Sequence, residues 1–210
     1  MKKTFILIVL FVLPIVAYLF FASGVNNFGR LPILTENIKE LNVEGSDIKF
    51  EDRITVLGFL GGNVENRKGN AFNLNQKIYK RFHEFKDFQF VMLLPYGTEE
   101  STEELKNELA TLADVEKWHF VFSSPEIVKV VFESLQTDIS LDAELGTPYV
   151  FVIDKDLALR GRTDDEDEGT KYGFNSSLVS DLNNKMVDDI KIVLAEYRLA
   201  LKKNNAERTK

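Results

Sequence analysis

The chain has 210 residues, of which 44% are hydrophobic and 28% are charged, a composition typical of a globular protein. It contains no cysteine, which excludes disulfides, a cysteine nucleophile, a dithiol redox site and any thiolate metal site. Its 26 basic and 33 acidic side chains give a net charge of −7, whereas a nucleic-acid-binding domain needs a basic face. Composition therefore favours a globular domain with no nucleic-acid partner.

Residues 4–22 carry no charged side chain, are almost entirely apolar, and follow Lys2 and Lys3. As a helix this run is about 30 Å long, enough to cross the hydrocarbon core of a bilayer. The apolar region of a cleaved signal peptide is shorter, about 7–15 residues, although Ala22-Ser23-Gly24 resembles a weak cleavage site. We expect an uncleaved single-pass anchor that contacts membrane lipid through residues 4–22, with a cleaved signal as the alternative.

The two lysines also predict which side of the membrane holds the rest of the chain. Positively charged flanks stay in the cytoplasm, so we expect a bacterial-type inner membrane with an exported, periplasmic or extracytoplasmic, C-terminal part. The expected divisions are an anchor or signal over 1–23, a linker with edge strands over 24–52, a main folded domain over 53–205 and a basic tail over 206–210. The exported part has no disulfide, so its core alone must stabilise it.

Strand and helix patterns alternate from residue 54 onward. Buried apolar runs predict strands over 54–60, 88–94, 118–122, 149–153 and 157–162. Apolar periodicity and capping residues predict helices over 71–85, from 101, from 125 and over 177–203. We expect loops over 61–70 and 164–169, and short edge strands over 31–34 and 47–50. This alternation predicts an α/β fold with a central mixed sheet flanked by helices.

The order of elements resembles the thioredoxin fold, and two local features carry the resemblance. Gly146-Thr147-Pro148-Tyr149 places a proline directly before a buried strand, where thioredoxin-like proteins have a cis-proline. The strand–loop–helix unit over 54–85 corresponds to the part of that fold that carries redox or metal cysteines. The resemblance implies a cis Thr147–Pro148 bond that faces the 61–70 loop.

Residues 50–195 further resemble the Sco (SenC-like) family of cytochrome oxidase assembly proteins. The matching pieces are Phe59-Leu60-Gly61-Gly62 with Phe72-Asn73-Leu74, Trp118-His119-Phe120, and Val152-Ile153-Asp154-Lys155 with Leu159-Arg160-Gly161. The resemblance places the family's two cysteines near Asn63 and Arg67 and its copper-binding histidine near Gly146, and none of these positions holds such a residue. We therefore expect neither redox nor copper-transfer chemistry, no catalytic residue, no metal and no cofactor.

The expected binding mouth lies where the 61–70 loop faces the turn before residue 149. Glycine N–H groups and the charge of Arg67 suit an anion, but no Gly-Lys-Ser/Thr phosphate loop follows. The candidate residues of this mouth are Gly62, Asn63, Asn66, Arg67, Thr147 and Pro148.

Four other features have a structural explanation. We expect His83 to be partly exposed on its helix, and His119 to be buried and hydrogen-bonded. The acidic run over 164–168 lacks the spacing of an EF-hand and is expected to be a solvated loop. The basic end of the last helix suits the helix dipole, and it also suits contact with anionic lipid or an acidic partner.

Three functions remain open at this point. The first, which we favour, is a membrane-anchored, envelope-facing binding or assembly module with a protein partner, related to Sco-type respiratory oxidase assembly factors and not an enzyme. The second is a small-molecule-binding protein or a cysteine-independent enzyme that uses the 61–70 loop. The third is a structural subunit of a larger envelope complex.

Overall fold

The computed structural model describes residues 10–16, 18 and 29–208, with residues 200–208 described by their backbone alone. Residues 10–16 are helical. Among the described residues, no helix is both long enough and apolar enough to cross a membrane. Most of the anchor predicted over 4–22 lies outside the described residues, so the anchor stays a prediction.

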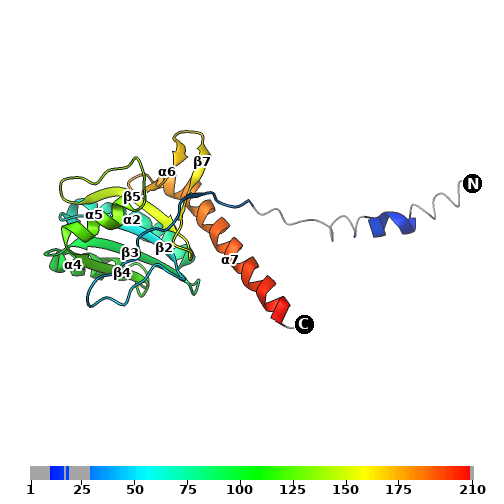
Figure 1. Ribbon diagram of the computed structural model, residues 1–210, viewed down its shortest axis with the longest axis horizontal. Coiled ribbons are helices and arrows are strands. Elements are labelled where there is room, and N and C mark those ends of the chain that lie inside the picture. Colours follow the sequence, from blue (N-terminus) through cyan, green and yellow to red (C-terminus); the bar gives the residue numbers. More distant parts are fainter. Residues whose placement is uncertain (1–9, 17, 19–28, 209–210) are drawn as a thin grey trace, which may run out of the picture.

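A mixed sheet forms the centre of the domain (Figure 1). Within the described residues its strands are β1 (Ile33–Thr35), β2 (Ile54–Leu60), β3 (Phe88–Pro95), β4 (Trp118–Ser123), β5 (Gly146–Ile153), β6 (Leu159–Arg160) and β9 (Phe174–Asn175). Their order is β1-β6-β5-β2-β3-β4, with β9 paired to β5. The pairs β2–β3 and β3–β4 are parallel, whereas β5 is antiparallel to β2, β6 and β9. The predicted α/β class with a mixed sheet is confirmed.

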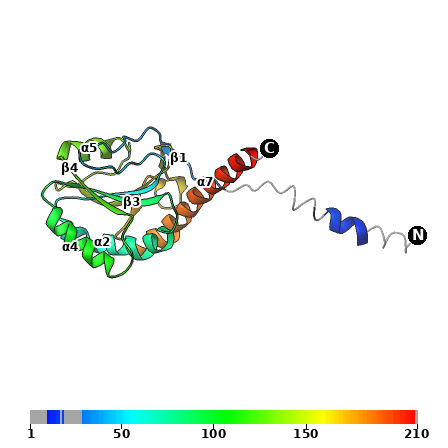
Figure 2. The same ribbon diagram turned by 90° about the horizontal axis from the view of Figure 1, so that it is seen from below.

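Helices cover both faces of this sheet. They are α2 (Val64–Leu74), η1 (Asn75–Tyr79), α3 (Lys80–Phe82), α4 (Glu99–Ala110), α5 (Pro125–Glu133), α6 (Val179–Asp181), η2 (Leu182–Met186) and α7 (Val187–Arg208). The two η segments are π-helical turns, and each joins its neighbours into one longer helix. Figure 2 shows α5 on one side of the sheet and α2 and α4 on the other.

The core is divided by the sheet into two parts because successive strand residues point to opposite faces. Val56 and Phe90 pack with buried residues of α2, α4 and α7. Leu57 and Val91, each one residue further along its strand, pack with α5 and with residues 38–50. The runs over 54–60 and 88–94 are apolar throughout because both faces of their strands are covered.

Residues 31–50 form part of this fold rather than a free linker. Leu31, Ile38 and Phe50 are buried, and β1 pairs with β6. The strand expected over 47–50 does not form. Instead, the Glu40 carboxylate accepts hydrogen bonds from the backbone N–H groups of Phe50 and Glu51 at 2.7 and 2.8 Å.

The region after residue 157 also differs from the prediction. The strand expected over 157–162 is reduced to β6, and the chain then forms the hairpin β7 (Arg162–Asp165) and β8 (Gly169–Lys171). The expected acidic loop is therefore the tip of a hairpin, and Asp165 within it is buried against Lys185 at 2.6 Å. The last helical segment runs from Val179 to Arg208, shifted from the predicted 177–203.

Candidate functional site

The candidate mouth begins where β2 ends and α2 starts. The expectation of a loop over 61–70 is wrong, because α2 begins at Val64. Asn63 caps this helix, and its side-chain oxygen accepts a hydrogen bond from the backbone N–H of Asn66 at 3.2 Å. Asparagines and a glycine make the segment a poor helix former, but burial of Val64 and Ala71 against the sheet overrides that propensity.

A turn over residues 142–146 lies directly against this helix start. The backbone N–H of Gly62 donates to the carbonyl oxygen of Glu144 at 2.7 Å. Gly61 has φ +75°, and a Cβ atom there would lie 2.8 Å from the same carbonyl oxygen, so the approach requires glycine. Since Leu60 is also paired with Gly146, the two segments that form the mouth are in direct contact.

An ion pair joins the two sides of the mouth. The guanidinium of Arg67 donates to the carboxylate of Asp142 at 2.6 Å, and that carboxylate also accepts from the N–H groups of Glu144 and Gly146. Burial acts to raise the pKa of Asp142, but the hydrogen bonds from Gly146 and Arg67 outweigh it and hold this pKa below its ordinary value. Asp142 is therefore ionised at neutral pH. We call this contact the Arg67–Asp142 latch.

The Thr147–Pro148 bond is trans, so the expectation of a cis bond is wrong. Pro148 lies inside β5, where its carbonyl oxygen accepts from both the N–H, at 2.8 Å, and the hydroxyl of Ser176. Thr147 is buried, and its hydroxyl accepts from the N–H of Tyr149 at 3.4 Å. The proline thus continues a strand that Ser176 holds in place.

The structure brings the predicted mouth residues to one end of the sheet. Gly62, Asn63, Asn66 and Arg67 lie at the start of α2, while Thr147 and Pro148 lie at the start of β5. Sequence reasoning missed Asp142 and Glu144, which supply the contacts that close the mouth. No local motif marked either residue, because their role depends on the pairing of β2 with β5.

The cations of this region already have anionic neighbours. Arg67 is paired with Asp142, and Lys68 is paired with Glu108 of α4 and lies 3.8 Å from Glu65. The N–H of Gly62 is also committed to Glu144. An anion would have to displace one of these contacts, so ligand binding at the mouth stays a prediction.

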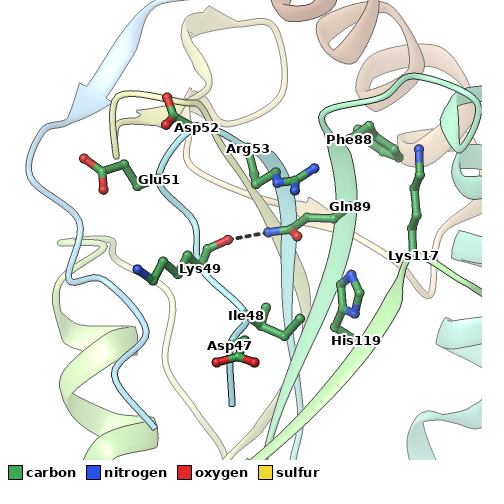
Figure 3. A pocket seen from close by; sticks show the side chains of 10 residues that line it. All are labelled: Asp47, Ile48, Lys49, Glu51, Asp52, Arg53, Phe88, Gln89, Lys117 and His119. Atoms are coloured by element: carbon green, nitrogen blue, oxygen red, sulfur yellow. Dashed lines mark hydrogen bonds between the residues drawn. The ribbon is translucent and has the colours of Figure 1, made fainter.

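A second hollow, of about 360 Å³, lies at the opposite end of the sheet, where β2, β3 and β4 begin (Figure 3). Two cations that line it are committed to the backbone. Lys117 donates to the carbonyl oxygens of His83 and Phe85 at 2.6 and 2.7 Å, and Arg53 donates to that of Lys86 at 3.3 Å. These contacts satisfy carbonyl groups of the turn that follows α3, which explains Lys117 and Arg53 without a ligand.

The two histidines differ in their surroundings. His119 lines the second hollow half-buried, and burial, together with the charges of Arg53 and Lys106, lowers its pKa. Its imidazole is therefore neutral at pH 7, and no hydrogen bond joins it to the described part of the chain, unlike the expected bonded histidine. His83 is partly exposed as predicted, but it lies one residue past the end of α3 rather than within a helix, and its ring stacks on Tyr79 with centroids 5.3 Å apart.

Comparison with known proteins agrees with this architecture. No protein-family model and no curated protein matches the sequence. A proposed protein disulfide isomerase of Bacteroides thetaiotaomicron superposes with a TM-score of 0.52 at 10% identity, covering 79% of this chain and 94% of that one. A proposed electron transfer protein of Aquifex aeolicus gives 0.50 at 15% identity, covering 78% and 97%.

The similar structures also include thiol-disulfide oxidoreductases and Sco proteins. Copper-bound ScoI of Arabidopsis thaliana, for example, gives a TM-score of 0.39 at 15% identity, with 69% of this chain and 89% of that one covered. At these identities the likeness concerns the fold. The chain has a thioredoxin-like fold, and its sequence contains no cysteine.

Proposed function

We propose that this protein is a membrane-anchored, envelope-facing module that binds a partner protein and helps to assemble a complex, as Sco-type factors do for respiratory oxidases. On this proposal it is not an enzyme, and its thioredoxin-like fold serves as a binding scaffold. The observation that carries the proposal is the closed mouth of a cysteine-free chain. The Arg67–Asp142 latch and the Gly62–Glu144 bond occupy the place where redox relatives would expose a thiol.

The rim of the mouth offers a surface for a protein partner. Leu178 and Val179 are adjacent in the sequence and are 53% and 41% exposed, so together they place apolar surface at this rim. They follow Ser176, which is bonded to Pro148 and to the side chain of Asn73 on α2. Apolar side chains surrounded by polar residues are typical of a protein–protein contact.

The test is site-specific crosslinking in native membranes. A photoreactive residue in place of Leu178 is expected to crosslink one stoichiometric protein. The control position is Val130, which is 48% exposed on α5, away from the mouth. Leu178→Asp should weaken co-purification of that protein by at least tenfold, whereas Val130→Asp should not.

Two results would contradict the proposal. Equal crosslinking from both positions would mean that the mouth is not the contact surface. Stoichiometric binding of copper(I) by the purified chain would restore a metal function that the missing cysteines and histidine argue against. The anchor itself is tested by alkaline extraction of membranes, because an anchored chain stays in the membrane pellet.

A further inference from the structure

The N-terminal side of the domain is fastened to α7 at Leu31. The backbone N–H of Leu31 donates to the carboxylate of Glu196 at 2.9 Å, and its carbonyl oxygen accepts from Arg160 Nε at 2.9 Å. Arg160, which is 4% exposed, also pairs with Glu196 at 2.7 Å. We call this arrangement the Leu31 clamp, because one buried arginine holds both the incoming chain and the last helix.

The Leu31 clamp limits how far α7 can be from the predicted anchor. The apolar run ends at residue 22, and nine fully extended residues reach at most about 30 Å to Leu31. Beyond Glu196, α7 continues to Arg208, a further 18 Å or so at about 1.5 Å per residue. Figures 1 and 2 both show this part of α7 projecting past the sheet.

Charge is divided sharply between this projecting end and the rest of the exported chain. Residues 198–210 contain five basic side chains and one acidic side chain, a net charge of +4. Residues 24–197 contain 19 basic and 32 acidic side chains, a net charge of −13. An anionic surface would therefore attract the end of α7 and repel the body of the domain.

We propose that the C-terminal end of α7, residues 198–208, docks on the anionic phospholipid surface of the membrane that holds the N-terminal anchor. This inference rests on the anchor of the proposed function. Each basic residue close to an anionic bilayer strengthens attraction about fivefold, but only within the screening distance of about 8–10 Å. The Leu31 clamp keeps α7 within about 30 Å of extended chain from the end of the predicted anchor, so its basic end can approach the membrane surface.

The experiment uses the full chain reconstituted into nanodiscs. Because the sequence has no cysteine, Ala206→Cys provides a single attachment point for a spin label on α7. A relaxation agent bound to lipid headgroups then reports contact between the label and the surface. Contact should be at least fivefold greater in discs with 30% phosphatidylglycerol than in phosphatidylcholine discs, and should fall again in 0.5 M salt. A label at Val130→Cys on α5 should not respond.

A charge variant separates specific docking from general attraction. Lys202→Glu with Lys203→Glu should abolish the response of the Ala206→Cys label. The matched control, Lys86→Glu with Lys129→Glu, changes the net charge equally at exposed sites outside α7 and should leave the response intact.

The outcomes distinguish this inference from the proposed function. If the chain inserts into the discs but the label responds equally to both lipids, the docking inference is overturned and an acidic protein becomes the partner of α7. The docking inference is also overturned if the two pairs of lysine substitutions change the response of the label equally. If the chain does not insert into discs at all, the anchor is wrong, and both this inference and the membrane part of the proposed function fail.

Discussion

Replacing Arg160 tests the Leu31 clamp as a source of stability. Its guanidinium lies between the buried carboxylate of Asp154 at 2.9 Å and that of Glu196 at 2.7 Å. In Arg160→Met, Asp154, which is 1% exposed, would remain as a buried charge without a cation. Removing one partner of such a pair costs about 3–5 kcal/mol. Asp154 keeps two backbone hydrogen bonds at 3.0 Å, so we expect a loss near 3 kcal/mol.

The loss can be measured by urea unfolding of the chain in mild detergent. Trp118 is the single tryptophan and is 2% exposed, so its fluorescence reports on the core. With a slope of about 2 kcal/mol per molar urea, a loss of 3 kcal/mol lowers the midpoint by about 1.5 M. The control is Arg81→Met, because Arg81 is exposed and, among the described residues, its side chain bonds only to a neutral amide, Asn183, at 3.2 Å.

The control variant and a double variant test whether the loss comes from the buried Arg160–Asp154 pair. Arg81→Met should change stability by less than about 0.5 kcal/mol. If Arg160→Met lost less than 1 kcal/mol, the idea that the buried pair with Asp154 depends on Arg160 would be refuted. Adding Asp154→Asn to Arg160→Met should recover part of the loss, because the remaining group is then neutral.

Three further variants test other parts of the fold by the same unfolding assay. Asp142→Asn should cost under about 1 kcal/mol at pH 7, since the carboxylate is largely exposed. Its folded pKa is depressed, so the stabilisation is fully present above the unfolded pKa of 3.8 and is lost as pH falls through the lower folded pKa, where the difference from wild type should vanish; a pH-independent gap would contradict this. Lys171→Met should cost about 3 kcal/mol, because Lys171 is fully buried and Asp181 would lose its cation at 3.1 Å; a neutral effect would argue against the pair. Gly61→Ala should cost more than about 1 kcal/mol through its positive φ and the contact with the turn, and unchanged stability would refute that backbone constraint.

The fold could be predicted from sequence where burial sets a clear pattern. The strand over 54–60 agrees with β2 residue for residue, and Ser124 caps α5 as its Ser-Pro-Glu sequence indicates. Both signals are local, since an apolar run and a capping residue act through their own neighbours. The order of strands and helices is also predictable, because it follows from the order of these local signals along the chain.

The parts that could not be predicted depend on contacts distant in sequence. The start of α2 at Val64 cannot be predicted from its own segment, because burial of Val64 and Ala71 is what makes this stretch helical. The Arg67–Asp142 latch joins residues 75 positions apart, and no pattern within either segment specifies it. The hairpin after β6 is unpredictable for a related reason, because burial of Asp165 requires a cation from another element, Lys185.

The Leu31 clamp also determines where mechanical load enters the domain. A force that pulls on the chain before Leu31 acts first on the bonds of Leu31 to Arg160 and Glu196. Glu196 passes this force to α7, and Arg160 passes it to the turn at Asp154. The short edge strand β1, with only two register pairs to β6, is thereby relieved of bearing that pull alone. A domain built this way resists peeling of its sheet from the edge, since unzipping would have to begin by breaking the bonds of Leu31 to Arg160 and Glu196.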